Sequence, residues 1–400
     1  MTEGKLTPRL AVAALPALLW IAAAPPAPAQ DNTKLLSDQV FKNVQVLKGI
    51  PVDDFMGTMG IMSAALGFDC SECHTNAGTD KVDWAADTQR KVISRRMVLM
   101  MQNINKENFS GRQMVTCWSC HHGRDHPSTS PSMETVYGAV NPETDDMMTQ
   151  APGQPEAAVI IDKYIKALGG ADKLAAIKSY VATGTSVGFG GFGGGGRVQL
   201  YAKFPNERAT YIEFPDAPER GDSIRTCNGK AAWIMTPLTI LGRYQMTGGE
   251  FEGARLDAEL GFPGQIKQVL NNMRVALPTT ISDLPGPSSQ TAKESEGGIG
   301  KDRLVNVVQG TGANGVLATM YFDQESGLLV RVVRLTRSPI GRVPTEVDYS
   351  DYRDVNGVKM PFRVTFAWLD GRDAIQFKEI KANVAIDEAK FGMPISSKGK

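Results

Sequence analysis

Apolar residues recur at helical spacing in two stretches of the first third of the chain. The first stretch follows Pro51, a residue that favours the start of a helix, and the second covers residues 89–101. Their methionines are Met56, Met59, Met62, Met97 and Met101. Intervals of three or four residues place side chains broadly on one face of a helix. The pattern therefore predicts two helices, each with a methionine-bearing face.

The pattern changes from residue 156 onward. Residues 156–168 keep a helical pattern that ends at Gly169-Gly170, and residues 197–204 then alternate between polar and apolar. Turn signals follow between apolar runs at Asp323–Gly327, Asn356-Gly357 and Asp370-Gly371. Successive hairpins with few helices predict a large antiparallel sheet, curved into a half-barrel. The expected fold class is α+β, with a mostly helical N-terminal region.

The first 29 residues have the pattern of a signal peptide. Lys5 and Arg9 precede an apolar run from Leu10 to Ala24, and Ala27-Pro28-Ala29 is a cleavage signal that leaves Gln30 as the mature start. The alternative is an uncleaved membrane anchor. The apolar run is short for a membrane span, and no later stretch reaches the roughly 18 apolar residues that a span needs. We therefore expect that the mature chain lies in the periplasm and has no transmembrane span.

The length and the net charge of the chain give two further expectations, one on the number of domains and one on the kind of partner. The chain has 400 residues, which predicts two domains, and its 43 basic and 43 acidic residues give a formal net charge of zero. A nucleic-acid-binding protein needs a clustered basic surface. Nucleic acid is therefore not expected as a partner.

Four of the five cysteines fall in two identical frames, Cys70-Ser71-Glu72-Cys73-His74 and Cys117-Trp118-Ser119-Cys120-His121. Both read C-x-x-C-H, the attachment pattern of c-type haem. On one helical turn the two thiols reach the two vinyl groups of one porphyrin, and the following histidine lies under the iron. We predict two covalently bound haem c groups. The predicted thioether residues are Cys70, Cys73, Cys117 and Cys120, and the proximal iron ligands are His74 and His121.

Other uses of paired cysteines do not explain both histidines. A single C-x-x-C pair could be a redox dithiol, and two pairs could hold a structural zinc ion. Neither function needs a histidine after each second cysteine. The fifth cysteine, Cys227, has no partner left and is expected to be a buried thiol.

The sixth iron position separates electron carriers from enzymes. A methionine thioether there is typical of electron transfer, whereas an open position suits oxygen or peroxide chemistry. The methionines of the two predicted helices are candidates. The alternative is that each of them packs in the core, as methionine often does.

Residues from about 40 to 124 resemble the tetrahaem cytochrome subunit of photosynthetic reaction centres. The matching stretches are Val40–Leu47, Phe55–Met59, Cys70–His74, Ser94–Met97, Ile104-Asn105 and Val115–Gly123. The resemblance implies that Met59 is the distal ligand of the His74 haem and that Met97 is that of the His121 haem. Both intervals to the cysteines are slightly shorter than in the family, so a shift of one turn to Met62 or Met101 stays open.

The chain also departs from that family. Full-length members carry four haems, whereas this chain has two motifs. The family has a histidine before its second cysteine pair that serves a distant haem, and residues 108–112 contain none. Photosynthesis therefore does not follow from the resemblance.

The second half of the chain loosely resembles the periplasmic lipoprotein-carrier fold, in which a curved sheet clasps acyl chains. The stretches that carry this likeness are Tyr349–Arg353, Asn356–Pro361 and the hairpin at Asp370-Gly371. The resemblance implies a possible lipid or acyl ligand. The expected organisation is a signal peptide (1–29), a dihaem cytochrome c domain (30–127), a linker (128–155), an antiparallel β domain (156–394) and a tail (395–400).

The last two histidines and the glycine-rich stretch are not expected to take part in catalysis. His122 and His126 are expected at the surface, and the glycine-rich residues 188–196 are read as a hairpin tip because a strand follows them. Every histidine lies before residue 127, so the second half has no Ser-His-Asp set.

Together these observations predict a periplasmic dihaem c-type cytochrome that transfers single electrons between periplasmic or membrane redox proteins, and not an enzyme. One alternative is a dihaem peroxidase-like oxidoreductase. The other is a haem-bearing protein of the cell envelope that binds lipid or lipoprotein through its sheet.

Overall fold

The computed structural model describes residues 35–79, 81–127, 129–131, 133–137, 146–187, 195–216, 221–236, 241–282, 302–369 and 371–395. The predicted signal peptide, residues 1–29, lies outside the described residues. All described residues belong to one compact unit, Lys34–Lys400.

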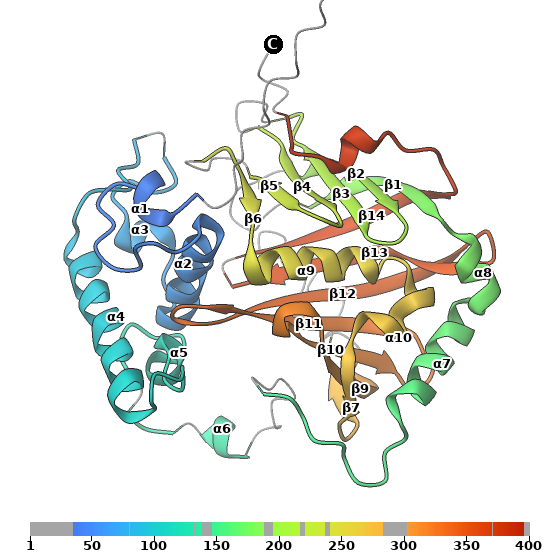
Figure 1. Ribbon diagram of the computed structural model, residues 1–400, viewed down its shortest axis with the longest axis horizontal. Helices are drawn as coiled ribbons and strands as arrows, with labels where there is room; N and C mark the ends of the chain where they lie inside the picture. The colour runs from blue at the N-terminus through green and yellow to red at the C-terminus, as the bar shows by residue number, and fades with distance from the viewer. Residues whose placement is uncertain are drawn as a thin grey trace, which may run out of the picture. The chain divides into compact units, whose positions relative to one another are not determined.

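The N-terminal region is helical, as predicted (Figure 1). Its helices are α1 (Ser37–Val40), α2 (Val52–Leu66), α3 (Cys70–Cys73), α4 (Gln89–Asn108), α5 (Cys117–His121) and α6 (Met133–Tyr137). Helix α2 begins directly after Pro51 and ends at Gly67, whose φ of 67° suits a residue without a side chain. Thr88 caps α4, because its side chain accepts a hydrogen bond from the backbone N–H of Lys91.

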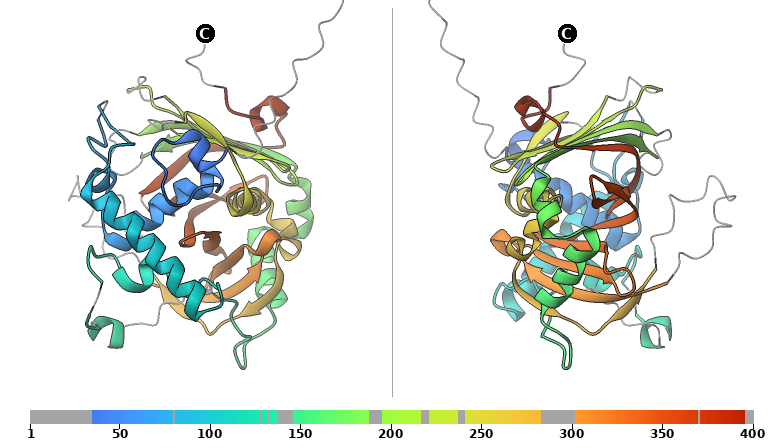
Figure 2. Two further views of the ribbon diagram at one scale, coloured as in Figure 1. Left: turned by 60° about the vertical axis from the view of Figure 1, so that its left-hand side comes forward. Right: turned by 90° about the vertical axis from the view of Figure 1, so that its right-hand side faces the viewer.

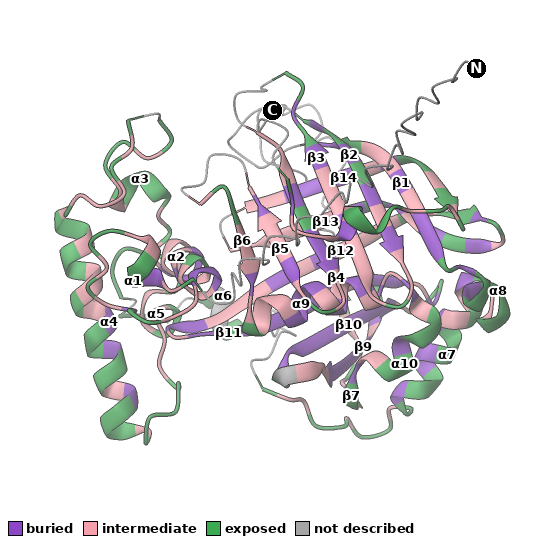
Figure 3. Cartoon of the chain, turned by 45° about the horizontal axis from the view of Figure 1, so that its top comes forward, coloured by how far each residue is buried: buried purple, intermediate pink, exposed green. Residues whose placement is uncertain are grey.

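A small core holds these helices together. It contains Leu47, Ile61 of α2, and Val98 and Met101 of α4, together with Ile340 from the C-terminal half of the chain. Helix α4 buries only a narrow stripe and leaves most of its surface exposed (Figure 3). The hydrophobic stabilisation of this region therefore depends on few side chains.

The described residues from 146 onward form a sheet of 14 strands with helices against it. The strands are β1 (Ser179–Ser186), β2 (Gly196–Lys203), β3 (Glu207–Glu213), β4 (Ser223–Asn228), β5 (Ala232–Met235), β6 (Arg243–Met246), β7 (Asn271–Val275), β8 (Thr279–Ile281), β9 (Arg303–Thr311), β10 (Leu317–Asp323), β11 (Leu329–Ser338), β12 (Gly341–Val355), β13 (Val358–Trp368) and β14 (Gly371–Ala382). The helices are α7 (Ala157–Leu168), α8 (Ala171–Ala176), α9 (Gly248–Glu259) and α10 (Ile266–Val269), with short 3₁₀ turns at Pro263–Gln265, Ala313–Gly315 and Glu388–Phe391.

Every strand pairing in the sheet is antiparallel, which confirms the predicted α+β class. The order is β6-β5-β4-β3-β2-β1-β14-β13-β12-β11-β10-β9-β7, with β8 paired to β9, so the sheet is open and not a closed barrel. The predicted hairpin at Asn356-Gly357 joins β12 to β13 through the pair Val355–Val358. Both turn residues have positive φ, 54° and 80°, as a tight two-residue hairpin requires.

The sheet bends around helix α9, so that β3–β5 and β11 lie on different sides of this helix (Figure 2). The main core fills the concave face and includes Ile161 and Leu168 of α7 and Ile266 of α10. Alternating strands such as β2 turn their apolar residues toward this core. Asp370 and residues 188–194, at two other predicted turns, lie outside the described residues.

Residues 146–155, in the predicted linker, contact the sheet. The backbone N–H of Ala151 donates to the carbonyl of Val275 in β7 at 2.8 Å, and that of Met148 donates to Oε1 of Gln309 in β9 at 2.6 Å. The predicted domain boundaries stay predictions. No helix in the described part of the chain is long and apolar enough to cross a bilayer.

Candidate functional site

The first C-x-x-C-H motif forms a single helical turn, α3. Asp69 caps this turn, because its Oδ1 accepts a hydrogen bond from the backbone N–H of Ser71 at 2.7 Å. Cys70 and Cys73 stand three residues apart on the turn, and His74 follows in an extended conformation. The motif therefore adopts the local geometry that the spacing predicts.

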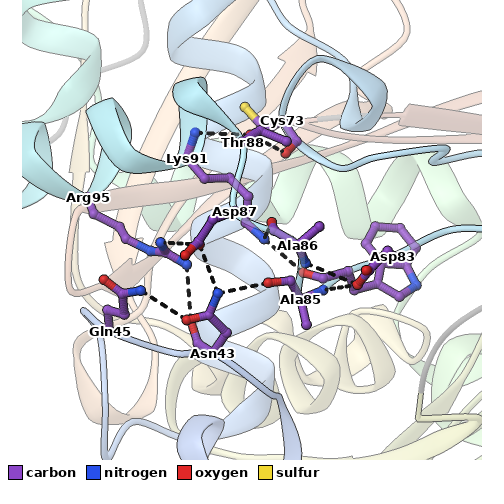
Figure 4. Close-up of polar contacts among 11 residues, drawn as sticks. Asn43, Gln45, Cys73, Asp83, Ala85, Ala86, Asp87, Thr88, Lys91 and Arg95 are labelled. Carbon is purple, nitrogen blue, oxygen red and sulfur yellow. Dashed lines mark hydrogen bonds and ion pairs between the residues drawn. The ribbon is translucent and has the colours of Figure 1, made fainter.

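Hydrogen bonds tie this motif to the start of α4 (Figure 4). The hydroxyl of Thr88 donates to the carbonyl of Cys73 at 2.9 Å while it caps α4. The ammonium of Lys91 donates to the carbonyls of Trp84 at 2.9 Å and Ala86 at 2.8 Å. The loop between the motif and the helix is thus held at both of its ends.

A second set of polar contacts supports the same loop. Asn43 donates through Nδ2 to Asp87 at 2.8 Å and to the carbonyl of Ala85 at 2.8 Å, and Arg95 pairs with Asp87 at 2.6 Å (Figure 4). These hydrogen bonds lower the pKa of Asp87. The sequence showed Asn43 and Arg95 only as parts of matching stretches. Their supporting role depends on a contact across 52 residues that no local pattern predicts.

His74 is partly buried beside Trp84, with ring centroids 5.0 Å apart. Its Nδ1 is buried and makes no hydrogen bond within the described part of the chain. Burial lowers the pKa of His74, and the charge of Lys91 lowers it further. A lowered pKa favours the neutral imidazole, which is the form that ligates a metal.

The second motif forms the single turn α5 with a reciprocal cap. The backbone N–H of Ser119 donates to Oγ1 of Thr116 at 3.3 Å, and the N–H of Thr116 donates to Oγ of Ser119 at 3.0 Å. Nδ1 of His121 lies 2.9 Å from the carbonyl of Arg124. Because a carbonyl only accepts, this contact suits the neutral tautomer that carries its proton on Nδ1 and has on Nε2 the lone pair that an iron ligand requires.

Asn105 joins the second motif to α4. This buried residue accepts hydrogen bonds from the backbone N–H groups of Met114 and Val115 at 2.9 Å and donates to the carbonyl of Val115 at 2.7 Å. The segment that enters α5 is therefore fixed to the helix that carries Met97. The sequence placed Asn105 in a matching stretch without a role.

We expect Asn105→Ala to lower the free energy of unfolding by about 2–4 kcal/mol, because three backbone groups lose their partner in a buried place. Urea denaturation of the purified protein measures this change. Asn108→Ala is the matched control on the same helix, since exposed Asn108 makes one hydrogen bond, to the carbonyl of Ile104 at 3.2 Å. Equal effects of the two substitutions would contradict the role of Asn105.

None of the five cysteines, all of which lie in the described part of the chain, forms a disulfide. Burial raises the pKa values of Cys73 and Cys117, so both stay protonated near neutral pH. Within the described ranges, no three His, Cys, Asp or Glu side chains form a group that could hold a metal ion. Cys227 is buried at 2% exposure, and its sulfur lies 3.8 Å from the carbonyl of Asn206.

The methionines differ in their surroundings. Met101 is 5% exposed in the small core and Met62 packs against that core, whereas Met59 and Met97 are intermediate in exposure and belong to none of the core clusters. On α4, Ile93 and Met100 lie on the face of Met97 and are 45% and 47% exposed. A partly exposed apolar stripe suits the face of a porphyrin, and the thioether at its centre packs in none of the core clusters.

Packing between the helices bears on the same assignment. Helix α2 packs on α5, and α3 contacts α4. Each motif thus contacts the helix that the resemblance assigns to the other haem. The pairing of Met59 with His74 and of Met97 with His121 stays a prediction.

Carboxylates gather where α2 meets the segment that follows β6. Asp53 is 3% exposed and accepts hydrogen bonds from the backbone N–H of Thr247 and, at 2.8 Å, from its hydroxyl. Burial raises the pKa of Asp53, and the hydrogen bonds from Thr247 oppose this rise. The pKa of Asp54 is raised to about 6, first by burial and then by the negative charges of Asp53 and Glu250.

The raised pKa of Asp54 gives a pH prediction. The folded state binds the proton more tightly than the unfolded state, so stability falls as pH rises from about 4 through about 6. We expect Asp54→Asn to flatten this slope and to stabilise the protein at neutral pH by roughly 1 kcal/mol after solvent screening. Denaturation at a series of pH values measures both effects, and an unchanged slope would contradict them.

The two capped C-x-x-C-H turns beside methionine-bearing helices are the features of a c-type cytochrome. Residues 17–163 match a family model described as photosynthetic reaction centre cytochrome C subunit. The N-terminal region is therefore similar to these reaction-centre subunits, which confirms the resemblance. This similarity suggests a haem c electron-transfer protein.

Individual relatives agree with the family model. The photosynthetic reaction center cytochrome c subunit of Rubrivivax gelatinosus is 29% identical over 140 residues, which cover 34% of this chain and 35% of the relative. That of Thermochromatium tepidum is 33% identical over 105 residues, or 25% of each chain. The chain thus spans about a third or less of the length of these relatives.

Solved structures resemble the sheet. A LolA superfamily protein from Nitrosomonas europaea aligns with a TM-score of 0.35 and 12% identity over 60% of this chain and 98% of its own. A putative outer membrane lipoprotein-sorting protein domain from Vibrio parahaemolyticus aligns with a TM-score of 0.33 and 9% identity over 58% and 97%.

The remaining histidines lie at the surface, as predicted. His122 is exposed in a left-handed conformation with φ of 51°, and its ring lies 6.0 Å from that of Trp118. The side chain of His126 is 86% exposed.

Proposed function

We propose that the chain is an extracytoplasmic dihaem c-type cytochrome that carries single electrons between redox proteins. The observation that carries the proposal is the pair of capped C-x-x-C turns, each followed directly by a histidine that is suited to ligate iron. In the second motif the Nδ1 of His121 is bound to a carbonyl, which leaves Nε2 for the iron. Haem would supply the one-electron chemistry when bound.

The residues that would hold the two groups follow from the motifs. Cys70 and Cys73 would bond one porphyrin, and Cys117 and Cys120 the other. His74 and His121 would be the proximal ligands. Met59 and Met97 would fill the sixth positions, which leaves no iron open to peroxide and favours a carrier over a dihaem peroxidase.

The proposal is tested on the exported, purified chain. A pyridine haemochrome assay should give two haems per polypeptide, and the intact mass should exceed that of the polypeptide by two haems. The reduced spectrum should be low-spin, with no change on addition of carbon monoxide. A colourless protein of bare polypeptide mass would refute the proposal, and carbon monoxide binding at one iron would favour the peroxidase alternative.

A cavity in the sheet region favours a second candidate, binding of a lipid or acyl group. Its volume is about 80 Å³, and most of its lining is apolar, including Leu200, Phe262 and Met360. Tyr180 and Arg208 also line it. Burial raises the pKa of Tyr180, and the positive charge of Arg208, together with its hydrogen bond, opposes this rise. An apolar chain with a polar end would match this lining. Native mass spectrometry of gently purified protein should then show a bound lipid.

A further inference from the structure

The turn between β11 and β12 carries an apolar residue that is completely buried. The strands end at the pair Ser338–Gly341, so Pro339 and Ile340 form the turn, and Ile340 has no exposed surface. The tip of a two-residue hairpin normally faces water and carries polar or flexible residues. A buried isoleucine at this position requires a partner surface outside the sheet.

That partner surface is the helical region (Figure 1). Ile340 belongs to one core cluster with Leu47, Ile61, Val98 and Met101, and with no buried residue of the sheet. A Cβ on Gly341 would lie 3.5 Å from Ile61 and 3.6 Å from Thr116, which places the tip between α2 and the cap of α5. The hairpin thus completes the core of the helical region.

Polar contacts fix the tip in this position. The hydroxyl of Ser338 donates to the carbonyl of Gly341 at 2.9 Å and accepts from the N–H of Ile340 at 3.3 Å. The side chain of Gln113, which precedes the second motif, donates to the carbonyl of Ser338 at 3.0 Å. The hydrogen bond from Gln113 crosses 225 residues of sequence and holds the turn against the segment that enters α5.

The helices that Ile340 contacts also carry the proposed iron ligands. Ile61 shares α2 with Met59, and Val98 shares α4 with Met97, each on a different face of its helix from the methionine. Cys117 packs against the same cluster. Protein interiors are close-packed, so loss of a central side chain lets the surrounding elements shift.

We propose that Ile340 is a positioning residue that sets the separation of α2 and α4 and thereby keeps a methionine on each iron. The inference rests on the proposed function. It makes the β11–β12 hairpin part of the cytochrome, so that whatever moves this hairpin acts on both haems together.

The test compares Ile340→Ala with Ile266→Ala. Both residues are fully buried isoleucines, but Ile266 packs only in the core of the sheet. Haem content is measured first, followed by the fraction of reduced haem that binds carbon monoxide and by both reduction potentials. We expect two haems in each variant. In Ile340→Ala alone, a measurable fraction of the reduced haem should bind carbon monoxide where none does in the native protein, and at least one potential should fall, because a methionine ligand raises the potential.

Two outcomes decide against different claims. If both variants match the native protein in carbon monoxide binding and potentials, Ile340 has only a structural role and the inference fails. If the native protein carries no haem, the proposed function fails instead. Should Ile340→Ala not be recovered, Ile340→Val removes one methyl group and is expected to show a smaller change in the same direction. Unchanged carbon monoxide binding and potentials in Ile340→Val then count equally against the inference.

Discussion

Replacing Cys117 and Cys120 together by serine should halve the haem content, from two groups per chain to one. Under the proposed function, this double substitution removes both thioether bonds to the second porphyrin, and His121 alone would hold a haem only reversibly. The first motif should be unaffected, because its cap on Asp69 and its link to Thr88 are formed by other residues. The measurements are the pyridine haemochrome assay and the intact mass under denaturing conditions.

The fifth cysteine is the matched control. Cys227 lies in β4, where its neighbours are Ala232, Met246 and Ala254 of the sheet region. Cys227→Ser should keep both haems and lower only the free energy of unfolding, by about 1–3 kcal/mol, for placing a hydroxyl in an apolar site. Two haems in the Cys117/Cys120 double variant, or haem loss in Cys227→Ser, would contradict the assignment of the motifs.

Met97→Ala should open one iron of the two. If Met97 is the proposed distal ligand, its loss would leave the sixth position of the His121 haem to water or to an added ligand, so the reduced protein should bind one carbon monoxide per chain. The potential of that haem should fall for the same reason. Stability should change little by comparison, because Met97 belongs to none of the core clusters.

The neighbouring methionine on α4 provides the control. Met101 is 5% exposed in the small core, so Met101→Ala should lower the free energy of unfolding by about 2–5 kcal/mol without carbon monoxide binding. The reverse result would move the ligand by one turn, to Met101. The same comparison between Met59 and Met62 on α2 tests the other haem, since Met62 packs against the core and Met59 does not.

Met97 and Met101 differ in burial, and this difference depends on tertiary contacts. In the sequence, Met97 and Met101 share a helical face, so the spacing alone does not separate them; the family resemblance implied Met97 and left a one-turn shift to Met101 open. Which of them packs depends on Leu47, Ile61 and Ile340, which come from other parts of the chain. Helical periodicity describes one helix at a time and carries no information about the surface that meets it.

The sequence by itself determined the features that depend on short-range geometry. The two C-x-x-C-H turns, the helix after Pro51 and the hairpin at Asn356-Gly357 all follow from residues within a few positions of one another. Backbone dihedral preferences and local caps set these elements before any distant contact forms.

The tertiary structure decided what those elements meet. Asn43 reaches Arg95 across 52 residues, and Gln113 reaches Ser338 across 225. The burial of Ile340 at a hairpin tip contradicts the usual character of such turns and becomes intelligible only with α2 and α5 beside it. Contacts of this kind arise because the chain buries apolar surface wherever the fold brings it together, and that choice depends on the whole fold and not on a local pattern.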